Sequence, residues 1–83
     1  MYETINGFPI IATYFTPATK SERAGRIILV DRIEDHGERY VVAWQAYDGH
    51  EPRWHYSWIM SAYCATLKDA RKVFAKRIER EPA

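Results

Sequence analysis

Four stretches of the chain show the alternating or continuous hydrophobic patterns that are typical of β-strands. Their β-branched and aromatic side chains favour an extended backbone. The stretches are residues 10–15, 26–33, 39–47 and 53–60. Gly7 and Pro9 place the start of the first strand at Ile10. The polar segment 16–25, which contains Pro17, predicts a loop between the first two strands.

A three-residue turn at 35–37 predicts how the second and third strands pair. Gly37 suits the left-handed position of a bulged hairpin turn. Glu34 would then lie opposite Glu38, and continued pairing sets even-numbered residues against even-numbered residues. The expected partners of Tyr40, Val42 and Trp44 are Arg32, Val30 and Ile28. The even-numbered residues of both strands are therefore predicted to share one face of the sheet.

The loop between the third and fourth strands decides which face an aromatic row on the fourth strand occupies. The row consists of Trp54, Tyr56 and Trp58, at alternate positions. Asp48-Gly49 would suit a two-residue turn, but Pro52 cannot donate to a ladder and favours a longer loop. We expect the odd loop, residues 48–52. An odd loop puts Trp44 on the face of the row, and an even loop puts it on the opposite face.

Residues 66–82 carry the clearest helical pattern. Thr66, followed three residues later by Asp69, is similar to a capping box and predicts the start of a helix. Pro82 predicts its end. Hydrophobic residues recur at helical spacing at Leu67, Ala70, Phe74 and Ile78, with Val73 beside them. Lysines recur on the opposite side at Lys68, Lys72 and Lys76.

These elements predict a single α+β domain over residues 1–83. We expect an antiparallel sheet of three to four strands with one C-terminal amphipathic helix packed on one face. Both faces of the sheet are too apolar to be solvated, and a single helix covers only one of them. The N-terminal segment with Phe8 and Phe15, or a second molecule, is expected to cover the other.

Composition narrows the possible chemistry. Three Trp, six Tyr and three Phe give an 83-residue chain the large side chains that a small core needs. Cys64 is the only cysteine, which excludes an internal disulfide and fits a reducing cytoplasm. No secretion signal or membrane-spanning run is visible. The spacing of the three histidines and Cys64 matches no compact zinc pattern. We therefore expect a cytoplasmic protein without catalytic site, metal or cofactor.

Charge is unevenly distributed although the net charge is only +1. Residues 66–83 carry six Lys or Arg against three Asp or Glu, whereas 1–65 carry six against eight. The lysine row of the helix is thus a candidate contact for phosphate or an acidic partner. The alternative is an ordinary solvated helix face, which is the default for an amphipathic helix.

Two further groups of residues are candidates for partner binding. Arg53 and His55 alternate with the aromatic row, and Tyr47 lies just upstream. Exposed aromatic residues can stack bases or anchor a protein interface. Size favours the alternative that the row is buried core, which leaves these three as the exposed contacts. Lys20 and Arg23, in the loop after the first strand, can bind an anion or a partner, or belong to a plain connection.

Residues 13–19 and 23–27 resemble the opening of short proteins carried by phages and mobile elements. In these a Pro-Ala-Thr-Asn stretch leads into an Arg-Gly-Ser-Arg-Ile run, and an Ala-rich helix ends the chain. Lys20 stands where Asn is expected, and residues 21–24 lengthen the connection. The resemblance implies a mobile-element accessory protein. This group includes anti-CRISPR proteins, which occupy a surface of a host defence complex. It carries over no functional residue.

The leading hypothesis is a non-enzymatic interaction module that binds and blocks a host protein or ribonucleoprotein complex, as an anti-CRISPR inhibitor does. The first alternative is a direct nucleic-acid binder that uses aromatic sheet residues and the basic helix face. The second is a small homodimeric regulatory protein, formed by pairing uncovered sheet faces. No membrane partner is expected.

Overall fold

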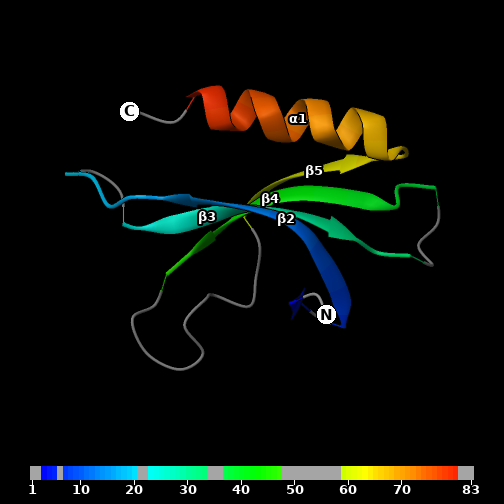
Figure 1. Cartoon of the computed structure of the whole chain (residues 1–83), viewed down its shortest axis with the longest axis horizontal. Coiled ribbons are helices and arrows are strands. Elements are labelled where there is room, and N and C mark those ends of the chain that lie inside the picture. Colours follow the sequence, from blue (N-terminus) through cyan, green and yellow to red (C-terminus); the bar gives the residue numbers. More distant parts are fainter. Residues whose placement is uncertain (1–2, 6, 21–22, 34–36, 48–58, 81–83) are drawn as a thin grey trace.

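The computed structural model describes residues 3–5, 7–20, 23–33, 37–47 and 59–80. They form a five-stranded antiparallel sheet in which each strand pairs with the next along the chain. The elements are β1 (Thr4–Ile5), β2 (Phe8–Thr16), β3 (Gly25–Asp31), β4 (Tyr40–Ala46), β5 (Ile59–Cys64) and α1 (Leu67–Arg80). The helix packs across one face of the sheet (Figure 1). The predicted α+β class is confirmed, with β1 as an additional two-residue strand.

The start of the helix follows from its first residues. The Thr66 hydroxyl accepts a hydrogen bond of 3.2 Å from the backbone N–H of Asp69. The Thr66 carbonyl accepts another, of 3.1 Å, from the N–H of Ala70. The first bond satisfies an N–H group that the first helical turn leaves without an intrahelical partner, and the second is the first i to i−4 bond of the helix itself. The predicted cap is confirmed, and Pro82, the predicted stop, lies outside the described residues.

The face of the sheet beneath the helix forms one half of the core. Period-two alternation brings odd-numbered residues of β3 and even-numbered residues of β4 to this face. Its buried members are Ile27, Leu29, Val42, Cys64 and Ala70. Trp44 is half-buried and packs against them, as do Leu67, Val73, Phe74 and Ile78 of the helix. The helical stripe that the spacing predicted is therefore the side of α1 that faces the sheet.

The opposite face forms a second buried layer. Its buried residues are Ile5, Ile10, Ile28, Val30, Val41 and Ala43. Phe8 packs against this layer, so the N-terminal segment contributes to its cover as predicted. The prediction was wrong for Phe15, which is 65% exposed and lies farther along β2.

The predicted register between β3 and β4 is wrong by one residue. Ile27 lies opposite Trp44, and Ile28 lies opposite Ala43. Gly37 adopts the predicted left-handed conformation, with φ of 81°. Ile33 is also left-handed, with φ of 46°, so the extended pairing assumed from the turn does not continue through it. A shift of one residue reverses every side chain.

The fourth predicted strand also has different limits. In the described residues β5 runs from Ile59 to Cys64, beyond the predicted end at residue 60. It pairs with β4 at both ends, where Tyr40 lies opposite Cys64 and Trp44 lies opposite Ile59, and the register shifts between Val42 and Trp44. The predicted loop 48–52 and the aromatic row at 54–58 lie outside the described residues.

Candidate interaction surface

One edge of the sheet is open where β2 runs past the short strand β1. β2 pairs with β3 from Ile10 to Thr16, whereas β1 pairs only with Phe8 and Pro9. The N–H of Ile10 still donates to the Glu3 carbonyl, at 2.8 Å. Beyond it, residues 11–14 pair on their outer side with no strand among the described residues. An open edge presents backbone N–H and C=O groups to which another strand can add.

The course of β2 explains why β1 leaves this edge open. The β2–β3 register shifts between Ile10 and Ala12, which is the mark of a β-bulge. A bulge bends and twists its strand. Figure 1 shows β2 curving away from the plane of the sheet toward its N-terminal end, where β1 joins it. β1 is thereby placed beside the start of β2 and not beside its second half.

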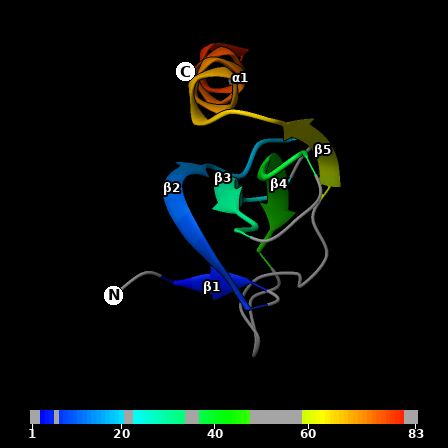
Figure 2. The same cartoon turned by 90° about the vertical axis from the view of Figure 1, so that its right-hand side faces the viewer.

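A groove lies between this edge and the helix. α1 packs on β3, β4 and β5, and β2 lies to one side of it (Figure 2). The space between the helix and β2 is an open cavity of about 480 Å³. Its lining residues are Ile11, Ala12, Leu29, Leu67, Phe74 and Arg71. Five of these six described residues are apolar and one is cationic, so this part of the groove offers a hydrophobic surface beside a positive charge.

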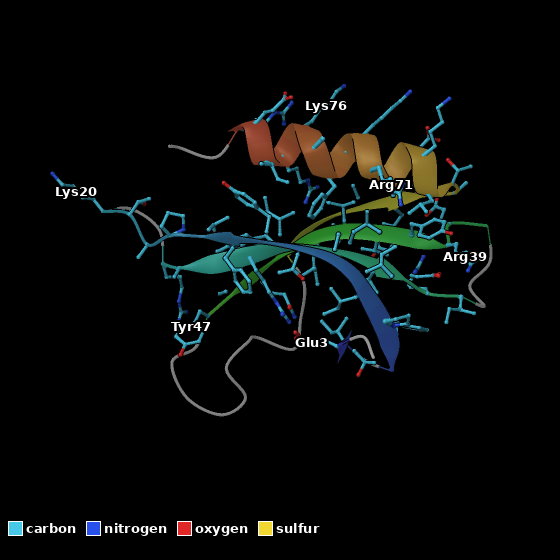
Figure 3. All side chains as sticks on the ribbon, in the orientation of Figure 1. Glu3, Lys20, Arg39, Tyr47, Arg71 and Lys76 are labelled. Atoms are coloured by element: carbon cyan, nitrogen blue, oxygen red, sulfur yellow. The ribbon has the colours of Figure 1, made fainter. Side chains whose placement is uncertain are left out.

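Arg71 is that cationic group. It is exposed, and within the described part of the chain it makes no hydrogen bond or ion pair. Figure 3 shows its side chain on the sheet side of α1, whereas Lys76 points away from the sheet. A guanidinium presents five N–H donors in a planar fork that matches a carboxylate or phosphate. Arg71 is therefore available for an anionic ligand at the groove.

Tyr14 lies two residues along β2 from Ala12, which lines the groove. It lies opposite Ile27 in the β2–β3 register, so its side chain is on the helix side of the sheet. It is 39% exposed. An aromatic ring with a polar tip suits a contact that is apolar along the ring and hydrated at the hydroxyl.

The structure separates the residues that the sequence singled out. Lys20 and Tyr47 lie at the same end of the sheet (Figure 3), and the Tyr47 N–H donates to the Ala24 carbonyl at 2.9 Å. Arg23 is the neighbour of Ala24 and is exposed. The lysine row, Lys68, Lys72 and Lys76, is exposed on the helix. Arg53 and His55 lie outside the described residues. The predicted contacts thus belong to at least two separate surfaces.

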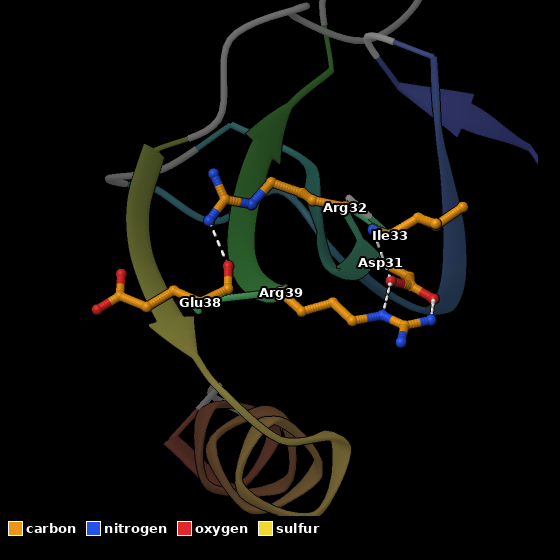
Figure 4. A network of polar contacts seen from close by, with 5 residues as sticks. All are labelled: Asp31, Arg32, Ile33, Glu38 and Arg39. Atoms are coloured by element: carbon orange, nitrogen blue, oxygen red, sulfur yellow. Dashed lines mark hydrogen bonds and ion pairs between the residues drawn. The ribbon is translucent and has the colours of Figure 1, made fainter. Parts of the chain in front are cut away.

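A polar network at the β3–β4 hairpin is structural in character (Figure 4). Asp31 accepts hydrogen bonds from Arg39 Nε at 2.7 Å and Arg39 Nη2 at 2.9 Å. It also accepts one from the Ile33 N–H at 2.9 Å, and Arg32 donates to the Glu38 carbonyl. The bonds from Arg39 hold the pKa of Asp31 below its ordinary value, although burial opposes this. An ionised carboxylate that accepts three hydrogen bonds anchors the hairpin and is poorly suited to proton transfer.

A second polar group joins β1 to the sheet. Arg26 is only 3% exposed; its Nε donates to Gln45 Oε1 at 2.9 Å. Its Nη1 lies 2.7 Å from a carboxylate oxygen of Glu3, beside β1. A buried guanidinium requires such partners because desolvation of an unpaired charge is costly. The group therefore holds the N-terminal segment in place.

The described residues offer little for catalysis or metal binding. They contain no group of three or more His, Cys, Asp or Glu side chains close enough to hold a metal ion. Cys64 is buried, and burial, followed by the charge of Asp69, raises the pKa of its thiol. A protonated thiol is a poor nucleophile. Among these residues no helix has the length and apolar character that crossing a membrane requires.

Comparisons with known proteins add no relative. No family model matches the chain, and neither the curated proteins nor the solved structures gave a significant match. The surface must therefore be interpreted from its geometry. Sequence reasoning missed the groove because Arg71 falls between the apolar stripe and the lysine row of the helix. Its spacing from Leu67 and Phe74, four residues and three, was the available signal.

Proposed function

We propose that the protein is a non-enzymatic interaction module that binds an extended segment of a partner protein along β2. The observation that carries the proposal is the open β2 edge beside the apolar groove under α1. Strand addition gains affinity from main-chain hydrogen bonds, and side-chain pockets beside the edge add specificity. The surface combines both features on a rigid sheet.

The resemblance to phage and mobile-element proteins indicates the biological context in which such binding would act. A small inhibitor that occupies a surface of a host protein or ribonucleoprotein needs no catalytic group. It needs a stable scaffold and a few anchors, and the two buried layers of this sheet supply the scaffold. We therefore propose an anti-defence, anti-CRISPR-like role as the setting for this binding.

Selection from a display library of random linear peptides tests strand addition. Successive N–H groups of a strand point to opposite edges. A selected peptide that adds to β2 should therefore lose binding when alternate amides of one parity are N-methylated. The other parity should retain binding, which makes it the matched control. The proposal would be overturned if N-methylation of each of the two sets of amides abolished binding, or if N-methylation of neither set did. It would also be overturned if no peptide were selected.

Proline substitutions test the β2 side of the same contact. Of the adjacent residues Thr13 and Tyr14, one directs its N–H to β3 and the other directs it outward. The proline that removes the inward donor should destabilise the sheet. The proline that removes the outward donor should preserve the far-ultraviolet circular dichroism spectrum. It should weaken the affinity for the selected peptide by about tenfold or more. Full binding by the folded proline variant would contradict strand addition.

Direct binding of nucleic acid is a second candidate function, favoured by the exposed row of Lys68, Lys72 and Lys76. A phosphate backbone contacted by this row would bind with an affinity that falls steeply with salt, since counterions are released. Fluorescence anisotropy with a labelled single-stranded oligonucleotide at low and high salt measures this. Lys72→Glu should abolish the binding. No binding at low salt excludes this candidate.

A further inference from the structure

We infer that the segment bound along β2 is acidic, with a carboxylate that pairs with Arg71 and apolar side chains that enter the groove beside Ile11 and Phe74. The inference rests on the proposed strand addition and specifies the chemistry of the partner. It follows from the position of the helix relative to the edge, from the charges of the helix and from the composition of β2.

The position of the helix determines which side chains of an added strand it meets. An added strand lies about 4.8 Å outside β2, and its alternate side chains point to the helix side. There they face the flank of α1 that carries Leu67, Arg71 and Phe74. The side chain of the added strand that lies level with Arg71 would therefore meet a cation. The side chains two residues before and after it in the added strand would meet apolar surface.

Charge decides which side chain fits the level of Arg71. Arg71 is the only charged residue among the described residues that line the groove, and none of those residues is acidic. The whole helix is basic, with Lys68, Arg71, Lys72, Lys76, Arg77 and Arg80 against Asp69 and Glu79. Bidentate hydrogen bonds from a guanidinium to a carboxylate are stronger than those between neutral groups. A carboxylate thus complements the groove, and a Lys or Arg at that level would be repelled.

A second copy of the chain is a poorer occupant of the same edge. β2, from Phe8 to Thr16, contains no Asp or Glu that could meet Arg71 of a partner. Antiparallel pairing of two β2 edges about a twofold axis would also place both helices on one side of a continuous sheet. Their Arg71 flanks would then face each other across the junction, where like charges repel. The same charges attract an acidic segment.

The peptide library provides the test when it is selected separately against three folded proteins. Against the wild type we expect enrichment of Asp or Glu at one position, flanked two residues away by bulky apolar residues. Against Arg71→Glu the enriched residue at that position should become Lys or Arg. Lys76→Glu makes the same change of charge on the side of the helix away from the sheet, so it should retain the acidic preference.

A thermodynamic cycle then measures the contact. Replacement of the selected Glu by Gln in a synthetic peptide should weaken binding to the wild type by about tenfold, since a charge-assisted bond of about 1.4 kcal/mol is lost. The same replacement should change the affinity for Arg71→Ala by less than about twofold. Circular dichroism confirms that each variant is folded.

Three results would overturn the inference. In the first, the selected peptides need the β2 edge but show no preference for Asp or Glu, or show the same preference against Arg71→Glu. This result would support strand addition and contradict the acidic partner. In the second, light scattering detects a dimer, and the proline substitution that removes the outward N–H of β2 dissociates it. This result would assign the edge to a second copy of the chain. A single-stranded oligonucleotide whose binding requires Arg71 would assign the groove to nucleic acid. Failure to select any peptide would instead remove the proposed function itself.

Discussion

The indole ring of Trp44 lies against the backbone of Gly25. A Cβ at residue 25 would lie 2.4 Å from Trp44 Cε2, much closer than carbon atoms can approach. The indole Nε1–H donates to Thr16 Oγ1 at 3.2 Å, and Thr16 is the partner of Gly25 in the β2–β3 ladder. One ring on β4 thus crosses β3 and hydrogen-bonds to β2, so it joins three strands at this end of the sheet.

Gly25→Ala should destabilise the protein by about 1–3 kcal/mol, because the new methyl group displaces the Trp44 ring. The lower conformational entropy of Ala in the unfolded chain contributes about 0.4–1 kcal/mol in the opposite direction and does not offset the clash. Urea unfolding followed by far-ultraviolet circular dichroism measures the difference. In a Trp44→Leu background the clash is absent, so the same substitution should be neutral or stabilise the protein by up to about 1 kcal/mol. An equal cost in both backgrounds would show that the ring is not the cause.

Glu3→Gln should loosen the N-terminal segment. The substitution removes the charge that lies 2.7 Å from Arg26, and we expect a loss of about 1 kcal/mol because Glu3 itself is 56% exposed. Amide hydrogen exchange should accelerate at Ile10, whose N–H is bonded to the Glu3 carbonyl. Glu38→Gln, in the β3–β4 hairpin, makes the same change of charge at an exposed position and is the control. Unchanged exchange at Ile10 in Glu3→Gln would show that the ion pair does not hold β1.

Asp31→Asn should lower stability at neutral pH but not in strong acid. Hydrogen bonds from Arg39 hold the pKa of Asp31 below 3.8, its ordinary value, so folding favours the ionised form. The resulting stabilisation is fully present above that ordinary value and is lost as the pH falls through the lower pKa of the folded state. The urea unfolding midpoints of the wild type and Asp31→Asn, measured from neutral to acidic pH, should therefore converge in strong acid. A constant difference between the two proteins at every pH would contradict the assignment.

Cys64 should react with thiol reagents only when the protein opens. Its thiol is buried, and burial raises its pKa, so little thiolate is present near neutral pH. The reaction with a disulfide reagent should accelerate strongly in urea. Cys64→Ser combined with Ala65→Cys moves the thiol to an exposed position and should react rapidly without urea. Fast reaction of the native wild type would contradict the buried position.

Local signals in the sequence were sufficient for several elements. The helix, its Thr66 cap and the left-handed Gly37 follow from residues within a few positions of one another, and all three are confirmed. The face assignment of β3 and β4 failed because it depended on counting through Ile33. A β-branched residue with φ of 46° is rare, and its hydrogen bond to Asp31 is visible only in three dimensions.

The candidate surface depended on long-range geometry that the sequence does not state. β1 has only two residues and shows no strand pattern of its own. The open edge exists because the bulge before Ala12 bends β2, so that β1 pairs with the start of β2 and not with its second half. Arg71 lies at the groove because α1 crosses β3, β4 and β5 and not β2. Helical periodicity locates Arg71 on the helix but cannot locate the helix on the sheet.

The order of the strands has a kinetic consequence. Each described strand pairs with its neighbour in the chain, and the helix follows β5 directly. Contacts between near neighbours require little loop closure before they form, and chains with such topologies fold quickly for their stability. Rapid assembly shortens the time during which unpaired strands of nascent chains can associate with one another. A sheet whose described strands leave outer edges at β2 and β5 benefits from this topology, because its interior strands find their partners early.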